Sequence, residues 1–230
     1  MYLDKQTARE RAWAIQALLE KGQRFFRNLF GRTPQTKTVF LDTETTGLKP
    51  GPDHAEIIEI AMITETTEGS VEYWCVKVAP QHIHTAHPKA LEINGFTPEA
   101  WEDAWCPVTI APLVAEKLEG AIVVGHNVKF DLRFIQELFR STDLASDLDH
   151  VAEIDTQDLA RTYLKPTGLK SVSLVNCRKW LGWSTEGAHT AMQDTEDCRR
   201  LYYTLIHSGP MRTRLWKWFG PKRMKRANRQ

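Results

Sequence analysis

Apolar and polar positions follow two different periods along this chain. Between residues 38 and 78, apolar residues alternate with polar ones or form short β-branched runs, which predicts strands at Thr38–Glu44, Glu56–Glu65 and Val71–Val78. The second and third of these strands are expected to pair antiparallel, because the turn residue Gly69 separates them. The first third of the folded region therefore predicts a three-stranded meander.

From Pro88 onward the apolar spacing becomes helical, interrupted by two short apolar strands. The pattern predicts helices near Pro98–Trp105, Val108–Leu118, Asn127–Arg140, Gln157–Leu164, Ser171–Leu181 and Ala191–His207, with strands at Ala121–Gly125 and Ala152–Asp155. A meander followed by strand–helix units is typical of an α/β fold in which helices flank a mixed sheet of five strands.

The two ends of the chain differ from its middle. Residues 5–30 are rich in helix formers with apolar residues at helical spacing, so residues 1–34 are expected to form an amphipathic helical extension. This helix either packs on the main domain, residues 35–209, or contacts a partner or a second copy. Residues 210–230 form a separate tail, in which Trp and Phe are interleaved with eight Lys and Arg and no acid.

Charge is unevenly distributed, although the net charge of the 230 residues is only +1. Without its tail the chain carries 29 acidic and 22 basic residues. A basic tail on an acidic body indicates an anionic partner, either nucleic acid or a membrane surface, with a solubilising tail as the third alternative. No apolar run has the length of a membrane span and the first residues do not resemble a secretory signal, so a cytoplasmic protein is expected.

Four acids occupy positions where apolar residues are expected. Asp42 and Glu44 share one face of the first strand, because side chains alternate with a period of two. Asp131 falls on the apolar stripe of one predicted helix, and Asp194 falls on that of the last helix, whereas Asp197 is expected to project elsewhere.

Burying an ionised carboxylate costs several kcal/mol unless a cation compensates it. For any one of these acids an ordinary ion pair is an equally good explanation. For four together a divalent cation is favoured, because carboxylate oxygens suit Mg²⁺ or Mn²⁺.

Three separated motifs give the chain a recognisable relationship. Phe40–Leu48, Gly125–Asp131 and His189–Asp194 resemble, in order, the three motifs of the DEDDh-type 3'-5' exonuclease family, which includes proofreading epsilon subunits and has a ribonuclease-H-like fold. The histidine five residues before the last Asp is typical of this group. Supporting stretches are Glu56–Ile60, Ala90–Thr97 and Asp155–Arg161. One departure is Asn94, where the family often has His.

The resemblance implies a mechanism and a set of roles. Two divalent cations, Mg²⁺ or Mn²⁺, would be bound by Asp42, Glu44, Asp131 and Asp194, and His189 would be the general base. Residues implied to contact substrate are Thr45, Thr46, Gly47, Leu48 and Asn127, although Thr-Thr-Gly is also a common turn sequence. His82, His84 and His87 resemble a zinc cluster only superficially, because they lie in one loop.

The function expected is removal of nucleotides from a free 3' end, with single-stranded DNA favoured and a role in proofreading, repair or defence. An exoribonuclease is the alternative, because the contact that distinguishes RNA could come from residues outside the motifs. An inactive nucleic-acid-binding module is disfavoured, because all five motif residues are present. A proofreading role would require a polymerase or other protein partner in trans; the oligomeric state stays open.

Overall fold

The structure, a computed structural model, describes residues 37–206 except 52–53, 147, 149–150 and 187–189. The predicted helix at residues 5–30 and the basic tail from residue 210 both lie outside the described residues. The description that follows concerns the described part of the chain.

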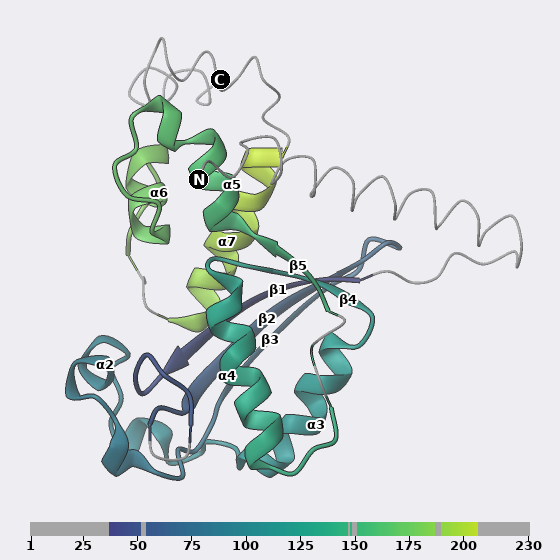
Figure 1. The fold of residues 1–230 in the computed structure, drawn as a ribbon, viewed down its shortest axis with the longest axis vertical. Coiled ribbons are helices and arrows are strands. Elements are labelled where there is room, and N and C mark those ends of the chain that lie inside the picture. The colour runs from purple at the N-terminus through teal and green to yellow at the C-terminus, as the bar shows by residue number, and fades with distance from the viewer. Residues whose placement is uncertain (1–36, 52–53, 147, 149–150, 187–189, 207–230) are drawn as a thin grey trace, which may run out of the picture.

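A mixed five-stranded sheet forms the centre of the molecule (Figure 1). The strands are β1 (Lys37–Thr45), β2 (Ile57–Thr66), β3 (Val71–Lys77), β4 (Ala121–Gly125) and β5 (Ala152–Asp155), in the spatial order β3-β2-β1-β4-β5. The first three strands form the antiparallel meander, and β4 and β5 add in parallel beside β1. This confirms the predicted α/β fold and makes β1 the middle strand.

Helices cover both faces of the sheet (Figure 1). The helices are α2 (Pro88–Ile93), α3 (Pro107–Leu118), α4 (Val128–Ser141), α5 (Thr156–Tyr163), α6 (Leu174–Leu181) and α7 (Ala191–Ile206), with short 3-10 turns at Ile83–Thr85, Glu99–Trp101 and Lys165–Thr167. Helices α3 and α4 pack on one face, whereas α5, α6 and α7 pack on the other.

Strand β1 contributes to both cores because its side chains alternate. Val39 and Leu41 join the core under α3 and α4, whereas Phe40 joins the core under α7 and lies against Tyr202, with ring centroids 5.6 Å apart. The three β1 side chains are fully buried, and each contributes roughly 1.5–3 kcal/mol of hydrophobic stabilisation. The next residues on the Phe40 face are Asp42 and Glu44, so the strand carries these acids toward α7.

The segment Pro98–Trp105 differs from the predicted helix. Only the 3-10 turn Glu99–Trp101 forms, because the following chain returns to the sheet edge, where the Trp105 amide donates to the Lys77 carbonyl at 2.9 Å. The buried Trp101 ring donates its Nε1–H to the Ile58 carbonyl at 2.8 Å. Tertiary contacts of two tryptophans thus override the local helical spacing.

The turn from β4 into α4 depends on Gly125. A Cβ atom at this position would lie 2.9 Å from Cβ of Val128 and 3.0 Å from its Cα, closer than real Cβ contacts occur. Glycine therefore allows α4 to begin directly beside the end of the strand, which brings Asp131 to the sheet. Gly120, before β4, has φ of +64° and nothing within 4 Å of the corresponding position.

Gly125→Ala is expected to lower the free energy of unfolding by roughly 1–3 kcal/mol, because the new methyl group overpacks the β4–α4 turn. Gly120→Ala is the matched control: it has space for a methyl group and bears only the left-handed backbone cost of roughly 1–2 kcal/mol. Urea denaturation of both variants measures the difference. A Gly120→Ala variant less stable than Gly125→Ala would contradict the crowding argument.

Candidate active site

Two acids of the candidate site lie at the end of the middle strand. Asp42 faces Ala61 and Glu44 faces Glu59 in the antiparallel register between β1 and β2. The register shifts between Glu44 and Thr45, so the strand ends its regular pairing just after the second acid. Both acids are half-buried, as their positions under α7 require.

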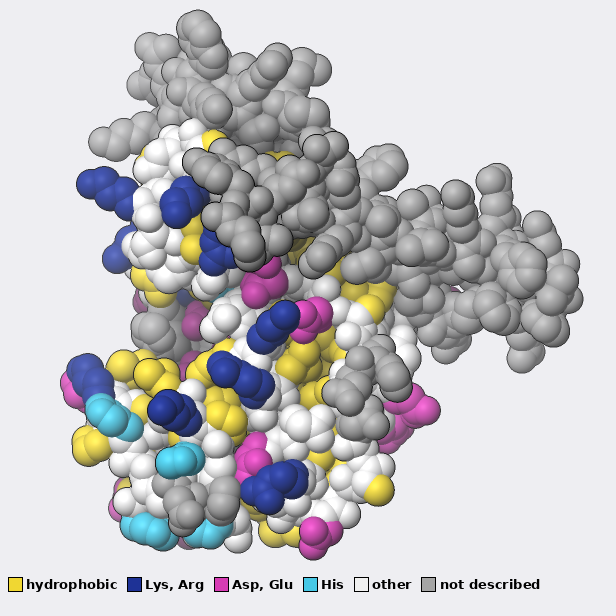
Figure 2. Space-filling view, in the orientation of Figure 1, with side chains coloured by type: hydrophobic (Ala, Val, Ile, Leu, Met, Phe, Trp, Pro, Cys, Tyr) yellow, Lys and Arg dark blue, Asp and Glu magenta, His cyan; other side chains and the backbone are white. Residues whose placement is uncertain are grey.

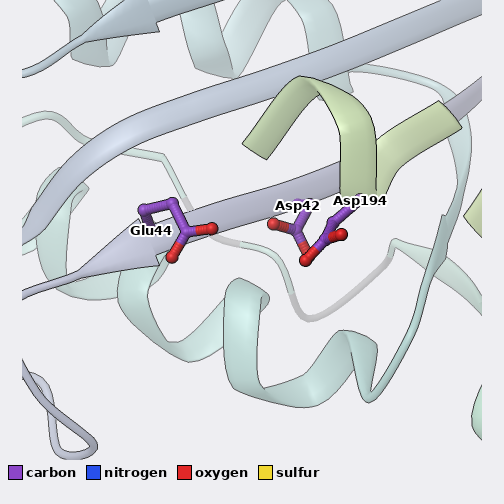
Figure 3. Close-up of side chains that lie close together, drawn as sticks. All are labelled: Asp42, Glu44 and Asp194. Carbon is purple, nitrogen blue, oxygen red and sulfur yellow. The ribbon is translucent and has the colours of Figure 1, made fainter. Parts of the chain in front are cut away.

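Helix α7 brings a third acid to the same place. Asp194 lies in the first turn of this helix, and carboxylate oxygens of Asp42, Glu44 and Asp194 lie within 4.8 Å of one another (Figure 3). Within the described residues, no other set of three acids, histidines or cysteines brings its ligand atoms as close together. Three of the four acids singled out by the sequence thus lie together, and their role as metal ligands stays a prediction.

The cluster is electrostatically costly. Burial is the largest effect on Asp42 and raises its pKa well above the ordinary value, with further increases from the charges of Asp131, Asp194 and Glu44. Burial, followed by the charges of Asp194 and Glu59, raises the pKa of Glu44 to about 8. Protein surrounds the Asp42 carboxylate closely, although the residue as a whole is only half-buried. Such a site favours either protons or another cation.

Asp131 lies beside the cluster on the opposite side of β1. Its Oδ1 accepts from the amide of Thr43 at 2.9 Å and from the Thr43 hydroxyl at 2.7 Å. The acid is buried, as predicted; burial raises its pKa to about 7, and the two Thr43 bonds oppose the increase. Asp131 is not in the group of carboxylates within 4.8 Å, so in this structure the fourth acid serves first to attach α4 to β1.

Glu59 is a site residue that the sequence reasoning did not single out. It projects from β2 directly opposite Glu44, and its Oε2 accepts from the amide of Ala191 at 3.2 Å. Glu59 thereby satisfies one of the unpaired amides at the start of α7, the helix that carries Asp194. The period of two was the available signal, since Ile57, Glu59 and Ala61 share one face of β2.

Asp197 corrects the expected orientation of α7. This residue is 4% exposed and pairs with the guanidinium of the buried Arg178, with Asp197 Oδ2 2.9 Å from Arg178 Nη1. The buried face of α7 is therefore wider than the apolar stripe through Asp194 predicts. A buried arginine supplies the compensating cation that the apolar pattern alone could not indicate.

The Thr-Thr-Gly segment makes a tightly bonded turn. The Thr46 amide donates to the Glu56 carbonyl and its hydroxyl accepts from the Glu56 amide, both at 2.9 Å. The hydroxyl of Thr45 donates to the Gly47 carbonyl at 2.7 Å, and the Asn94 side chain donates to the Thr45 carbonyl at 2.9 Å. These contacts support the turn interpretation for Thr45 and Thr46. Asn94, the departure from the family pattern, holds the turn in place.

The remaining candidate residues lie at the surface or outside the described chain. Leu48 follows the turn and is 81% exposed. Asn127 is also exposed and has φ of 72°, a left-handed conformation that costs free energy for a residue with a side chain. His189 lies outside the described residues, so its predicted role as general base stays a prediction.

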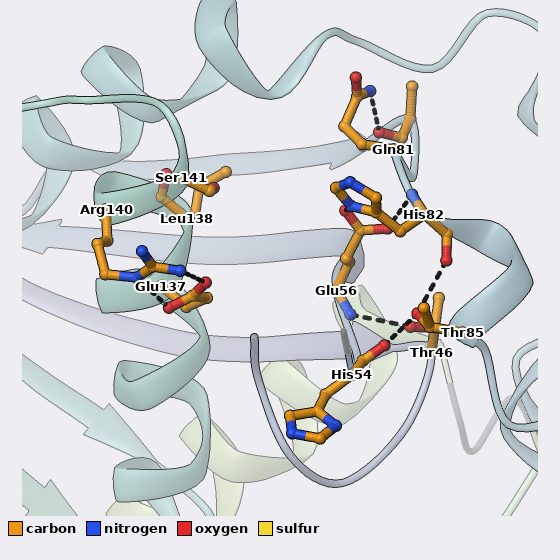
Figure 4. A network of polar contacts seen from close by, with 11 residues as sticks. Thr46, His54, Glu56, Gln81, His82, Thr85, Glu137, Leu138, Arg140 and Ser141 are labelled. Atoms are coloured by element: carbon orange, nitrogen blue, oxygen red, sulfur yellow. Dashed lines mark hydrogen bonds and ion pairs between the residues drawn. The ribbon is translucent and has the colours of Figure 1, made fainter. Parts of the chain in front are cut away.

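The histidine-rich loop has ordinary polar partners (Figure 4). His82 contacts Glu56 through its ring Nδ1 at 3.0 Å and through its amide at 2.7 Å, and His87 caps α2. Within the described chain, no group of three ligand atoms includes these histidines. His82 and His87 thus use polar partners from the chain itself, and His84 lies in the 3-10 turn Ile83–Thr85.

The cluster fits a divalent cation. Its three side chains offer only carboxylate oxygens, which match hard cations such as Mg²⁺ and Mn²⁺. Burial, together with the charges of neighbouring acids, raises the pKa values of Asp42 and Glu44, and a bound cation would offset both effects. Asp42, Glu44 and Asp194 could hold such an ion directly.

Among the described helices, none has the length and hydropathy needed to cross a bilayer.

Comparison with known proteins agrees with this geometry. A family model described as "Exonuclease" matches residues 39–202. PolC-type DNA polymerase III of Thermotoga maritima is 32% identical over 168 residues, which cover 73% of this chain and 12% of that protein. The epsilon subunit of DNA polymerase III of Treponema pallidum is 28% identical over 165 residues, which cover 72% of this chain and 74% of the subunit.

Among solved structures, exonuclease I of E. coli in complex with a dT13 oligonucleotide is similar, with a TM-score of 0.63 and 22% identity over 80% of this chain and 43% of that one. At this identity the similarity establishes the fold, which is ribonuclease-H-like. The class of protein is thus an α/β protein of that fold with an acid cluster on its middle strand. Within this class the chain belongs to the DEDDh-type 3'-5' exonuclease family of enzymes.

The raised pKa of Glu44 predicts how stability depends on pH without divalent cations. The folded state keeps the Glu44 proton up to about pH 8, whereas the unfolded chain releases it near its ordinary pKa of 4.5. This stabilising contribution is complete below the unfolded pKa and is lost as pH rises toward 8. In EDTA, the loss of stability between pH 5 and 8.5 should be smaller in Glu44→Gln than in wild type by roughly 1–3 kcal/mol.

Urea denaturation at each pH gives the comparison. Glu119→Gln, at an exposed position after α3, is the matched control and should follow the wild-type curve. Parallel curves for wild type and Glu44→Gln would contradict the assigned environment of Glu44.

Proposed function

We propose that this chain is a two-metal-dependent 3'-5' exonuclease that hydrolyses the terminal phosphodiester bond of nucleic acid and releases nucleoside monophosphates. The convergence of Asp42, Glu44 and Asp194 in a desolvated cluster carries the proposal. Such a cluster is costly to the fold in the absence of a cation, which indicates that it is kept for binding and chemistry. Membership of the exonuclease family supports the same reaction.

The chain's own acids would bind and orient the reacting groups. Asp42, Glu44 and Asp194, with Asp131 beside them, would hold two divalent cations, Mg²⁺ or Mn²⁺. Bound cations offset negative charge that develops on phosphate oxygens and make water a better nucleophile. Thr43 keeps Asp131 against the middle strand through two hydrogen bonds to Oδ1.

His189 would accept the proton from the attacking water. An imidazole has an unperturbed pKa near ~6.5, so it is effective as a base around neutral pH. The position of His189, five residues before Asp194 and two before the first residue of α7, favours a location near the cluster.

The substrate's terminal nucleotide would lie over the exposed Leu48, beside the Thr45–Gly47 turn. Leu48 offers an apolar surface next to polar surroundings, which suits a nucleobase. Asn127 projects from the start of α4, and its left-handed backbone is the kind of strain that concentrates at functional sites. Thr45 and Thr46 support this surface by fixing the turn.

Basic side chains are available for the nucleic-acid backbone. Lys and Arg side chains are spread over the face of the molecule seen in Figure 2. Lys129 and Arg133 are exposed on α4, the helix that begins at Asn127 and carries Asp131. Phosphate contacts from such residues would hold a strand on the acidic body.

DNA is the favoured substrate, with RNA as the alternative. The named relatives are DNA polymerase III subunits and polymerases, and the solved exonuclease I structure contains a DNA oligonucleotide. Because the chain spans only 12% of the PolC-type protein and 43% of the exonuclease I chain, roles in proofreading or repair, and any polymerase partner in trans, belong to the proposal.

Digestion of end-labelled single strands tests the function. In Mg²⁺ the protein should shorten 5'-labelled single-stranded DNA from its 3' end faster than an RNA of the same sequence, and EDTA should abolish the activity. Asp42→Asn should lower kcat by on the order of 10³-fold, because it removes a negatively charged metal ligand. The protein should stay folded, because Asn has nearly the same shape as Asp and does not repel the neighbouring acids.

Asp158→Asn is the matched control for charge removal, since Asp158 is an exposed acid on α5 paired with Arg161. It should keep wild-type activity. Near-normal turnover by Asp42→Asn would refute the proposed metal site. Equal rates on DNA and RNA would refute the DNA preference and leave the nuclease chemistry in place.

We further propose that the chain is divided into an N-terminal helical extension (1–34), the exonuclease domain (35–209) and a basic aromatic tail (210–230). The tail would hold nucleic acid close to the domain, because its eight positive charges oppose the net negative charge of the remaining residues. Trp216 and Trp218 could stack on bases, at roughly 1–3 kcal/mol each.

Truncation after Ser208 is therefore expected to weaken substrate binding and leave kcat largely unchanged. The slope of log affinity against log salt should fall by roughly 0.7 for each phosphate of a single strand that the tail neutralises in the full-length protein. Fluorescence anisotropy with labelled single-stranded DNA at several salt concentrations measures both effects. Unchanged affinity at low salt would exclude this role for the tail.

A further inference from the structure

Arg178 is an unusual residue in this fold because it is charged and fully buried. It comes from α6, its side chain is 2% exposed, and it is the largest of the side chains that the described residues bury completely. Burying a guanidinium is costly unless every donor finds a partner. The contacts made by Arg178 therefore indicate what its charge is used for.

Three nitrogens of Arg178 connect three parts of the chain. Nε donates to the Ser184 carbonyl at 2.8 Å and Nη2 donates to the Glu186 carbonyl at 2.9 Å, so the guanidinium fixes the backbone that follows α6. Nη1 points to α7, where it lies 2.9 Å from Asp197 Oδ2 and 3.5 Å from Asp194 Oδ1. The side chain thus spans α6, the following turn and the start of α7.

The two contacts of Nη1 differ in a way that suits a metal ligand. Asp197, which is more deeply buried, takes the short contact and also accepts from the Gln193 side chain at 3.2 Å. Asp194, at 14% exposure, takes the longer of the two Nη1 contacts. A guanidinium bonded closely to Asp194 would compete with a cation, whereas one held back by Asp197 can orient that carboxylate and leave it able to bind.

We propose that Arg178 is a positioning residue for the metal-binding acid Asp194, and that Asp197 holds the guanidinium at the distance at which it orients Asp194 without capturing it. This inference rests on the proposed function, because it assumes that Asp194 binds a divalent cation. Hydrogen-bonded partners of metal ligands commonly change metal affinity or activity by about 10–100-fold when they are removed.

A purely structural role for Arg178 would be to neutralise Asp197 and to join α6 to α7. The two roles are separated by removing the pair together. Replacing both members of a buried ion pair with apolar residues of similar volume is often neutral or stabilising, whereas removing one member leaves an uncompensated charge. The variant Arg178→Met/Asp197→Leu should therefore leave no uncompensated charge and keep the fold. It removes the contact to Asp194 together with the bonds of Arg178 to the Ser184 and Glu186 carbonyls.

The experiment measures Mn²⁺ binding to the full-length protein by electron paramagnetic resonance, without nucleic acid, at a temperature where thermal unfolding shows every variant to be folded. Arg178→Met/Asp197→Leu should bind Mn²⁺ about tenfold more weakly than wild type. In Mg²⁺, kcat on single-stranded DNA should fall by a similar factor with KM little changed, because the substrate-contacting surface is intact.

The control is Arg199→Met/Glu65→Leu, which removes another ion pair made by α7. Glu65 lies opposite Thr38 in the β1–β2 register, four residues along β2 from Ala61, the partner of Asp42, and so roughly 13 Å along the strand from the nearest acid of β1 in the cluster. This control should bind Mn²⁺ as wild type does. If any ion pair made by α7 supports the metal site only by stabilising the helix, both double variants should bind Mn²⁺ equally weakly. That result would overturn the proposal.

Wild-type Mn²⁺ affinity and kcat in Arg178→Met/Asp197→Leu would also overturn the proposal and make Arg178 structural. If that variant does not fold, Arg178→Lys decides in its place, because lysine keeps the charge but cannot reach all three partners. The Arg178→Lys variant should bind Mn²⁺ more weakly than wild type. An unchanged Mn²⁺ affinity in this variant would overturn the proposal. Failure of the wild-type protein itself to bind Mn²⁺ would refute the proposed function instead.

Discussion

The free-energy cost of keeping several carboxylates desolvated and close together is the constraint around which this structure is built. Asp42 and Glu44 lie on the strand that occupies the middle of the sheet, and Asp194 approaches them from α7. The raised pKa values of Asp42 and Glu44 reflect the free-energy cost of burying these two acids beside other carboxylates. Hydrophobic packing on both sides of β1 supplies the opposing free energy, since Val39, Phe40 and Leu41 immediately before the acids are fully buried.

The neighbouring polar contacts fix the elements that carry the acids. Thr43 bonds to Asp131 and so holds α4, Glu59 bonds to the amide of Ala191 and so holds the start of α7, and Arg178 joins α6 to α7. Each of these contacts lies within or beside the cluster. The same side chains therefore serve to place the helices and to shape the electrostatic environment of the site.

The sequence correctly predicted side-chain positions that depend only on the periodicity of one strand or one helix. The alternation along β1 placed Asp42 and Glu44 on one face, and helical spacing placed Asp131 in the core and Asp194 on the inner seam of α7. Periodicity could place Glu59 on one face of β2 but could not reveal its bond to the Ala191 amide or the Arg178–Asp197 pair, because those contacts join residues more than ten positions apart. The helix predicted for residues 98–105 is wrong for the same reason, since the Trp105 contact with β3 is not local.

The position of α7 along the chain has a consequence for biosynthesis. The cluster needs β1, near the start of the described chain, and the first turn of α7, near its end. A nascent chain that has left the ribosome only as far as α6 exposes the Phe40 face of the sheet and holds Asp42 and Glu44 without Asp194. The three acids can therefore come together only after α7 has been synthesised and has docked on the sheet.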